Sequence, residues 1–253
     1  MSTVQIPNYT TDPFFGLEDK WIETAESELT HYHEVGEGTP ILFLHGSGTG
    51  VSAAANWWLN LPQIAEQARC IAIDSIGYGQ TVVADGTAYG IRAWVDHAVR
   101  TLDALGIEKT WLVGNSLGGW LAFQMVLDYP ERVLGIVSMG TGGAKQTAAL
   151  KAHANPVLTE EGIKNTLSMF VVDKRLITDE LVKVRYEAAK NDYASDRLMD
   201  VVGARDRDRF EFAQDKEKMK DIQVPVLLIH GVQDVVIPVS RTWYILNTVP
   251  FAD

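Results

Sequence analysis

Apolar runs that end in glycine-rich turns recur along the 253-residue chain. They lie at residues 40–44, 69–74, 110–113, 134–139 and 224–230. Runs of this length without polar alternation are typical of parallel strands that are covered on both faces. The pattern therefore predicts a row of buried parallel strands.

Two segments between these runs carry apolar residues at helical spacing. Residues 91–105 place Ala98 and Leu102 on one helical face and stop at Gly106, and residues 120–127 form a second apolar helical pattern. Strands that alternate with helices pack as a parallel sheet with helices on both faces. The predicted fold class is therefore α/β, with a mostly parallel, doubly wound sheet.

Strand-like runs become rare in the segment after residue 143, where only 169–172 is a candidate. Thr159 and Thr178 each precede two acidic residues, which is the pattern of a helix N-cap followed by a negatively charged first turn. We expect a helical cap inserted into the core. The predicted units are the first part of the core (1–143), the helical cap (144–213) and the second part of the core (214–253).

The composition narrows the classes of partner. The net charge is −11 and the pI is about 5.0, so the surface would repel nucleic acid and anionic membranes. The first residues lack the pattern of a signal peptide, and no apolar stretch approaches the roughly 18 residues of a membrane-spanning helix. The single cysteine, Cys70, lies in an apolar run and is expected in the core. These features predict a soluble, cytoplasmic protein with a small-molecule partner.

A glycine-rich loop at residues 45–50 follows the first apolar run. Backbone N–H groups in such a loop can hold a phosphate or an oxyanion. Gly46, Gly48 and Gly50 do not match the spacing of a dinucleotide-binding loop, and no lysine of a phosphate-binding loop follows. We therefore favour an oxyanion, and we expect no cofactor and no metal.

The sequence Gly114-Asn115-Ser116-Leu117-Gly118 joins a strand-like run to a helical pattern. A serine at such a sharp turn takes a strained backbone conformation, and the flanking glycines allow strand and helix to cross closely. Its hydroxyl is then presented to solvent instead of packed. Ser116 is the candidate nucleophile.

Asp234 follows the apolar run at 224–230, and it comes after Ser116 in the chain. The ends of parallel strands meet at one edge of the sheet, so this loop, the loop at 45–50 and Ser116 should converge. The order serine then acid suits a triad in which Asp234 orients a base. Asp74, also at a strand end, is expected to be structural.

Several motifs together resemble the meta-cleavage-product hydrolases, α/β-hydrolases that cleave carbon–carbon bonds in bacterial aromatic degradation. The matching residues are His45-Gly46-Ser47-Gly48, Asn56, Trp94-Val95-Asp96-His97, Gly114-Asn115-Ser116-Leu117-Gly118-Gly119 and Leu176-Ile177-Thr178-Asp179-Glu180-Leu181. The resemblance implies that Ser116 attacks, that Asp234 orients the base, and that backbone N–H groups of Ser47 and Leu117 hold the oxyanion.

The resemblance also implies the substrate, an anionic dienoate of the 2-hydroxy-6-oxohexa-2,4-dienoate type. Gly46, Asn56, Asn115 and Arg185 match positions at its polar end, and the family suggests a homo-oligomer. Arg185 lies at the edge of an apolar helical stripe. A snorkelling arginine that shields apolar surface is the alternative explanation for it.

The chain departs from the family pattern in its histidines. The triad histidine should follow a further strand, but no histidine lies beyond His230, and we expect the last strand and helix of the fold to be missing. We favour a truncated form of a longer enzyme over a natural short form. The histidine is then expected outside the sequence, and the outer edge of the 224–230 strand is expected to be unpaired. His45 is expected to support its loop, and His230 is weighed as an improvised base.

Two other functions remain open. A carboxylesterase uses the same serine turn and oxyanion loop. A catalytically silent binding module on the hydrolase scaffold would explain the missing histidine. Dehalogenase and epoxide hydrolase activities are disfavoured, because those relatives carry aspartate in place of Ser116.

Overall fold

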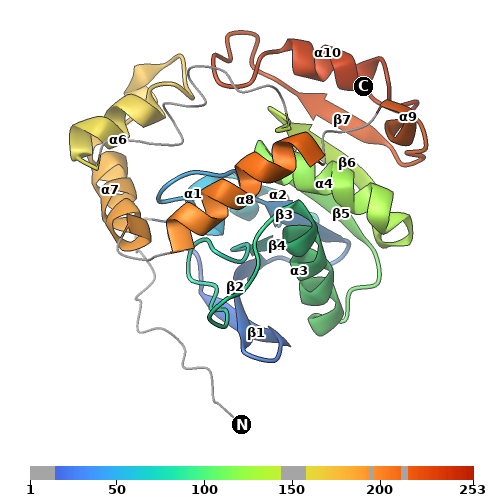
Figure 1. The fold of residues 1–253 in the computed structure, drawn as a ribbon, viewed down its shortest axis with the longest axis horizontal. Helices are drawn as coiled ribbons and strands as arrows, with labels where there is room; N and C mark the ends of the chain where they lie inside the picture. The colour runs from blue at the N-terminus through green and yellow to red at the C-terminus, as the bar shows by residue number, and fades with distance from the viewer. Residues whose placement is uncertain (1–14, 144–157, 194–196, 212–215) are drawn as a thin grey trace.

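The structure, a computed structural model, describes residues 15–143, 158–193, 197–211 and 216–253 (Figure 1). Its strands are β1 (Lys20–Ala25), β2 (Glu28–Val35), β3 (Pro40–Leu44), β4 (Arg69–Ile73), β5 (Thr110–Asn115), β6 (Val133–Met139) and β7 (Val226–Ile229). They form one sheet in the order β1-β2-β4-β3-β5-β6-β7. β1 pairs antiparallel with β2, and β2 pairs antiparallel with β4, whereas the other neighbours are parallel. The predicted mostly parallel sheet is confirmed.

Helices cover both faces of this sheet (Figure 1). One face carries α3 (Ile91–Ala104), α4 (Leu117–Asp128) and α10 (Ser240–Leu246), and the other carries α1 (Ala53–Trp57) and α2 (Leu61–Ile64). The short helix η1 (Pro130–Arg132) links α4 to β6. In β3, Leu42 and Leu44 pack on the first face and Phe43 packs on the second. Because successive strand side chains point to opposite faces, a continuous apolar run is what a sheet covered on both sides requires.

The helices that the structure describes between β6 and β7 are α6 (Glu160–Leu167), η2 (Lys174–Leu176), α7 (Asp179–Tyr193), α8 (Arg197–Glu211) and α9 (Lys216–Met219). Both predicted N-caps are confirmed. Thr159 Oγ1 accepts from Gly162 N–H at 3.0 Å, and Thr178 Oγ1 accepts from Leu181 N–H at 3.1 Å. The strand suggested at 169–172 is wrong, because residues 169 and 170 form turns after α6 and residues 171 and 172 are irregular. Residues 144–157, 194–196 and 212–213 of the expected cap, and residues 214–215 of the expected second part of the core, lie outside the described residues.

α8 is tied to the core through Asp208. This buried carboxylate accepts a hydrogen bond of 2.6 Å from the backbone N–H of Ile91, the first residue of α3. The preceding Gly90 has φ 147° and packs so closely on Asp208 that a Cβ there would collide with the carboxylate. Asp208 therefore satisfies a free N–H at the start of α3 and places α8 against it.

Residues 251–253 pair with the outer side of β7. The backbone N–H of Val226 donates to Phe251 O at 2.9 Å, and Leu228 N–H donates to Asp253 O at 2.9 Å. The expectation of an unpaired edge on β7 is therefore wrong for these positions. Leu227 and Ile229 nevertheless remain about half exposed, each at 47%.

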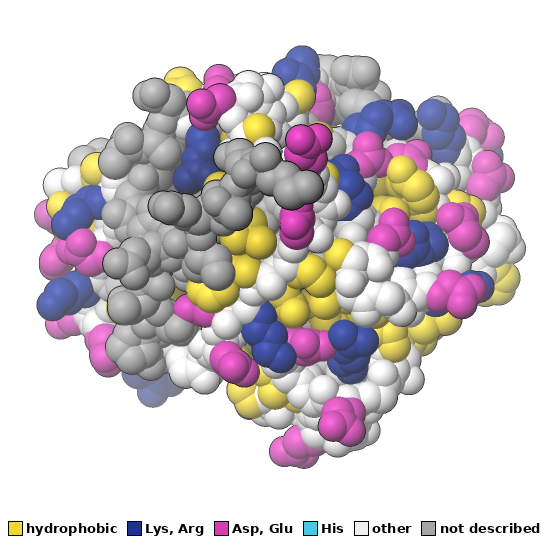
Figure 2. Space-filling model, turned by 90° about the horizontal axis from the view of Figure 1, so that it is seen from below, with side chains coloured by type: hydrophobic (Ala, Val, Ile, Leu, Met, Phe, Trp, Pro, Cys, Tyr) yellow, Lys and Arg dark blue, Asp and Glu magenta, His cyan; other side chains and the backbone are white. Residues whose placement is uncertain are grey.

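The surface mixes charges of both signs. On the face in Figure 2, acidic and basic side chains lie interspersed around a group of hydrophobic ones. Among the residues that the structure describes, no helix is both long enough and apolar enough to cross a membrane.

His97 is a titratable group buried between α3 and β2. Its Nε2 lies 2.8 Å from Thr30 Oγ1, and its side chain is fully buried. Burial lowers the pKa of His97 to about 4, from an ordinary value near 6.5. The folded protein therefore keeps this ring neutral in a pH range in which the unfolded chain protonates it.

The consequence is a loss of stability on acidification. Between pH 6.5 and 4, the unfolded state gains a proton at His97 that the folded state excludes, so this residue alone should lower the free energy of unfolding by about 1.4 kcal/mol per pH unit. Urea denaturation at a series of pH values gives the free energy of unfolding as a function of pH. We expect the slope of this plot between pH 6.5 and 4 to be smaller by that amount in His97→Gln, whose side chain can still bond Thr30. Parallel curves for the two proteins would contradict the assignment.

Candidate active site

Ser116 stands at the turn between β5 and α4. Its backbone has φ 53° and ψ −109°, in the left-handed region that a residue with a Cβ rarely adopts. A Cβ at Gly118 would collide with the backbone of Leu44, and one at Gly114 would collide with the backbone of Gly118. Glycine at both positions therefore lets α4 cross β3 and β5 closely enough to hold the strained serine.

Ser116 opens on a pocket that also contains the two predicted oxyanion donors. The pocket is lined by Ser47, Ser116, Leu117, Trp120, Gly142, Gly143, Arg205 and Ile237. Leu117 is the first residue of α4, so its N–H points out of the helix end, where a negative charge is favoured. The structure thus brings Ser47 and Leu117, which are 70 residues apart in sequence, into one pocket with Ser116.

Asn56 joins the glycine-rich loop at residues 45–50, the predicted oxyanion loop, to the serine turn at residues 114–118. Its Oδ1 accepts from the backbone N–H of Gly46 at 3.0 Å and from Asn115 Nδ2 at 3.1 Å. Three of the predicted substrate-binding residues are thus in direct contact. Because one amide oxygen accepts from both neighbours, the orientation of the Asn56 side chain is defined.

Asp234 lies beyond the carboxyl end of β7, as predicted. Its Oδ1 accepts from the backbone N–H groups of Val236 and Ile237, both at 2.8 Å, which fixes the carboxylate in its loop. Its other oxygen, Oδ2, lies 3.4 Å from His230 Nε2. Since Ile237 also lines the pocket, this loop connects the acid to the site of Ser116.

His230 is not available for the role of improvised base. Its Nε2 lies 2.9 Å from Ile237 O, a carbonyl oxygen that can only accept, so Nε2 carries the proton. Its Nδ1 lies 2.6 Å from Thr242 Oγ1 and accepts from that hydroxyl when the ring is neutral. Both ring nitrogens are occupied by the protein, and the suggestion of an improvised base is wrong for this conformation.

His45 supports the oxyanion loop, as expected. Burial lowers the pKa of this fully enclosed ring, so it is neutral. Its Nδ1 donates to Gly46 O at 2.6 Å, and its Nε2 accepts from Ser75 N–H at 3.0 Å. The ring therefore links the loop after β3 to the loop after β4.

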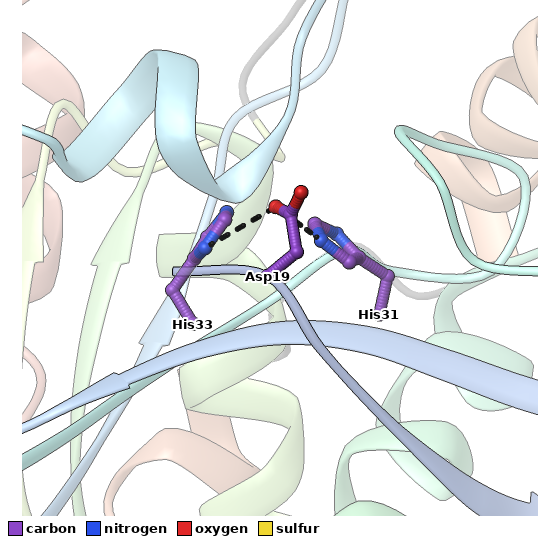
Figure 3. A group of neighbouring side chains, drawn as sticks. All are labelled: Asp19, His31 and His33. Atoms are coloured by element: carbon purple, nitrogen blue, oxygen red, sulfur yellow. Dashed lines mark hydrogen bonds and ion pairs between the residues drawn. The ribbon is translucent and has the colours of Figure 1, made fainter. Parts of the chain in front are cut away.

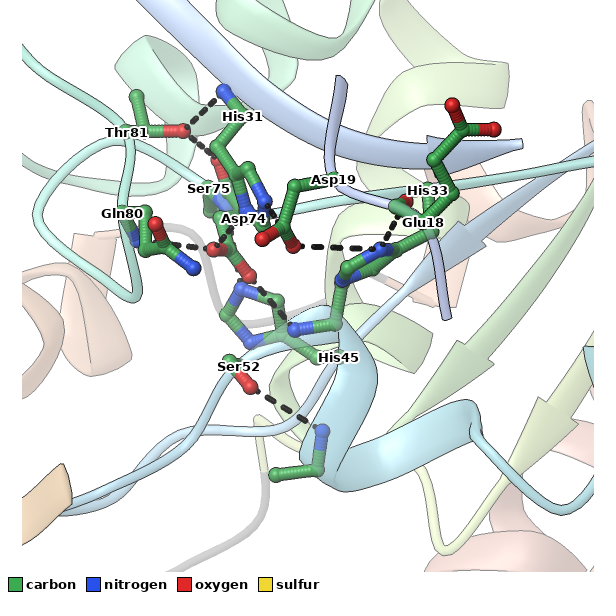
Figure 4. Close-up of polar contacts among 12 residues, drawn as sticks. Glu18, Asp19, His31, His33, His45, Ser52, Asp74, Ser75, Gln80 and Thr81 are labelled. Carbon is green, nitrogen blue, oxygen red and sulfur yellow. Dashed lines mark hydrogen bonds and ion pairs between the residues drawn. The ribbon is translucent and has the colours of Figure 1, made fainter. Parts of the chain in front are cut away.

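Asp74, in the loop after β4, is the centre of a buried polar network (Figure 4). Oδ1 accepts from the N–H of Ala53, the first residue of α1, at 2.6 Å, and Oδ2 accepts from Gln80 N–H at 2.8 Å and from His31 Nδ1 at 2.7 Å. Burial would raise the pKa of Asp74, but the charge and hydrogen bond of His31 hold it well below its usual range. The structural role expected for Asp74 is confirmed.

Asp19, His31 and His33 are the one group among the described residues that could hold a metal ion, with ligand atoms within 4.8 Å of one another (Figure 3). Burial lowers the pKa of His31, but Asp74 and Asp19 more than offset this and raise it. His31 therefore donates to both carboxylates, and Nε2 lies 2.9 Å from Asp19 Oδ1. His33 Nδ1 donates to Glu18 O at 2.8 Å. Hydrogen bonds therefore engage both nitrogens of His31 and Nδ1 of His33, and His33 Nε2 is buried without a hydrogen-bond partner in the part of the chain that the structure describes.

Arg185 in α7 reaches the oxyanion loop. Its Nη2 donates to Thr49 O at 3.3 Å, and its own backbone packs against Gly50. The guanidinium is not among the groups that line the pocket of Ser116. The structure therefore brings Arg185 to the loop that also carries Ser47.

Arg205 was missed from the sequence, although it lines the pocket and is only 4% exposed. It belongs to the alternating stretch Arg205-Asp206-Arg207-Asp208, which resembles a solvated helix face. The available signal was its spacing. Among the α8 side chains that the structure describes, the buried ones are Val201, Ala204, Arg205 and Asp208, at i, i+3, i+4 and i+7.

The close crossing at Gly118 gives a test of the serine turn. We expect Gly118→Ala to lower the free energy of unfolding by at least about 2 kcal/mol, because a Cβ there meets the backbone of Leu44 and not a side chain that can move. Gly203→Ala is the matched control. Gly203 is exposed in α8 with open space around it, so alanine should stabilise the helix by about 0.5–1 kcal/mol. Urea denaturation measures the free energy of unfolding of both variants. Small, equal changes in the two would contradict the conclusion that the approach of α4 to Leu44 requires glycine at position 118.

Comparisons with known proteins agree with this geometry. A model of the alpha/beta hydrolase fold family matches residues 39–250. A 2-hydroxy-6-oxo-2,4-heptadienoate hydrolase from Pseudomonas putida is 35% identical over 84% of this chain and 78% of its own length. A 2-hydroxymuconate semialdehyde hydrolase from Pseudomonas sp. CF600 is 37% identical over 84% of this chain and 76% of its own length.

A solved structure gives the same result. The meta-cleavage product hydrolase from Pseudomonas fluorescens IP01, as a mutant complexed with acetates, has a TM-score of 0.85 and 37% identity, covering 94% of this chain and 88% of that one. The chain therefore belongs to the α/β-hydrolase fold family and, within it, to the meta-cleavage product hydrolases.

Proposed function

We propose that the protein hydrolyses a carbon–carbon bond in a 2-hydroxy-6-oxo-dienoate formed by cleavage of an aromatic ring. The observation that carries the proposal is the strained Ser116 in a pocket it shares with Ser47 and Leu117. The relatives support the substrate class, since their names describe hydrolases of 6-oxo-dienoates and of a muconate semialdehyde.

The reaction runs in two stages. The dienol is first converted to its keto form, which makes the carbon next to the ketone a leaving group. Ser116 Oγ then attacks the ketone carbon, and the N–H groups of Ser47 and Leu117 stabilise the negative charge on its oxygen. The carbon–carbon bond breaks to give an acyl-enzyme, and water releases the acid.

The triad is completed by an acid and a base. Asp234, held by two backbone N–H groups, orients a histidine that takes the proton of Ser116. No histidine among the described residues lines the pocket, and the rings of His45 and His230 are occupied by other partners. The base is therefore a histidine other than these two.

The polar end of the dienoate lies on the oxyanion-loop side. Arg185 binds its carboxylate, while Gly46, Asn56 and Asn115 shape the adjoining contacts. The proposal divides the chain into a core made of residues 1–143 and 214–253 and a cap made of residues 144–213. It also includes a homo-oligomeric state and a cytoplasmic location.

The activity is tested by following two substrates in parallel, the loss of absorbance of a chromophoric 6-oxo-dienoate and the hydrolysis of a p-nitrophenyl ester. Both are measured with this chain and with a version in which a histidine-bearing strand follows residue 253. We expect the extended version to consume the dienoate and Ser116→Ala in the same background to lose this activity. Hydrolysis of the ester alone would support a carboxylesterase, and binding of the dienoate without any turnover would support a binding module.

Arg185 is tested by binding. We expect Arg185→Gln to weaken binding of the dienoate by about tenfold or more, because a charge-assisted hydrogen bond to the carboxylate is lost, and to leave a neutral ester analogue nearly unaffected. Lys183→Gln, which removes an exposed cation from the same helix, is the control. Equal losses for the anionic and neutral ligands would remove Arg185 from the site.

A further inference from the structure

Arg205 is a buried cation in the pocket of the nucleophile. Its side chain is 5% exposed, so it does not snorkel to water as surface arginines do. The pocket around it is otherwise formed mainly by apolar side chains and glycines, namely Leu117, Trp120, Gly142, Gly143 and Ile237. The guanidinium brings a positive charge and five N–H donors into this pocket.

The protein satisfies this charge only in part. Nε and Nη2 both donate to a single oxygen, Oδ1 of Asp206, at 3.2 and 3.1 Å, and that carboxylate is 41% exposed. Nη1 donates to the neutral hydroxyl of Ser47 at 3.3 Å, longer than the 2.7–2.9 Å of a strong charge-assisted bond. The Nη1 side, next to a residue of the oxyanion loop, is therefore the side on which an anion can still be received.

The two arginines near Ser116 occupy different places. Arg185 contacts Thr49 O and does not line the pocket, whereas Arg205 lines it together with Ser116 and Leu117. A ketone carbon attacked by Ser116 has two substituents. If the dienoate extends from it toward Arg185, the other substituent extends into the pocket of Arg205.

We propose that Arg205 binds a carboxylate on the substituent beyond the ketone, so that the preferred substrate carries an anionic group at both ends. This inference rests on the proposed function for the placement of the dienoate. An alkyl or phenyl substituent would cover the Nη1 side of Arg205 without adding a partner there, and further desolvation of a charge that is only partly paired is costly. A carboxylate instead gains two charge-assisted hydrogen bonds from the same group.

The products follow from the position of this second carboxylate. Hydrolysis adds the hydroxyl of water to the ketone carbon and a hydrogen to the adjoining dienoate carbon. The acyl fragment then leaves as a short dicarboxylic acid, and the other fragment leaves as a 2-hydroxydienoate.

Equilibrium binding tests the proposal without requiring turnover. Two dienoates are compared, one with a carboxyethyl group on the ketone and one with a propyl group of similar size, and binding is followed by tryptophan fluorescence, since Trp120 lines the pocket. We expect wild-type protein to bind the carboxyethyl compound about tenfold more tightly or better. Arg205→Gln should abolish this preference, and Arg207→Gln, which removes a mostly exposed cation from the same helix, should keep it.

A second variant protects the test against misfolding of Arg205→Gln. Asp206→Asn alters a partly exposed residue and removes the carboxylate that competes for Arg205. We expect it to strengthen binding of the carboxyethyl compound several-fold and to leave the propyl compound unchanged. No preference in the wild-type protein, or an equal change for both compounds in Asp206→Asn, would overturn the proposal.

Succinate separates this inference from the proposed function. If neither dienoate binds but succinate binds to wild-type protein and not to Arg205→Gln, the anion site stands and the dienoate function fails. If both dienoates bind equally well and depend on Arg185, the function stands and the role of Arg205 fails.

Discussion

The approach of α4 to β3 at Gly118 is the constraint on which the site depends. The helix backbone lies against Leu44 with no room for a side chain between them, and this contact forces the turn at Ser116 into the left-handed region. A strained residue persists only where its surroundings determine its conformation. Here the sheet on one side and the helix on the other determine the conformation of Ser116. The packing of α4 against the sheet thereby offsets the free energy of its strained backbone.

The oxyanion loop depends on a second, polar constraint. His45 links it to the loop after β4, and Asp74 in that loop collects hydrogen bonds from α1 and β2. Such a network is costly to bury unless every member is satisfied, and it then holds its segments in one arrangement. The position of Ser47 beside Ser116 is thus set by residues that do not line the pocket.

The strands, the serine turn and the place of Asp234 could be predicted because each rests on local pattern and on the rule that strand ends converge. The hairpin of β1 and β2 lacked so clear a pattern, since these strands are short of continuous apolar residues. Arg205 could not be placed from charge pattern alone, because alternating acids and bases are typical of an exposed helix. Arg205 is buried because α8 packs on α3. The spacing of residues along α8 places Arg205 on the buried side only once that side is known.

The contact between Asp208 and the start of α3 has a consequence for selectivity. Asp208 lies one helical turn after Arg205, so the hydrogen bond that joins α8 to the core also fixes the backbone from which Arg205 extends, and Asp206 and Ser47 hold its guanidinium. A cation held in place before a ligand arrives loses little conformational entropy on binding it. Discrimination between charged and uncharged substituents would then be present in the empty site, independent of any closure of the cap.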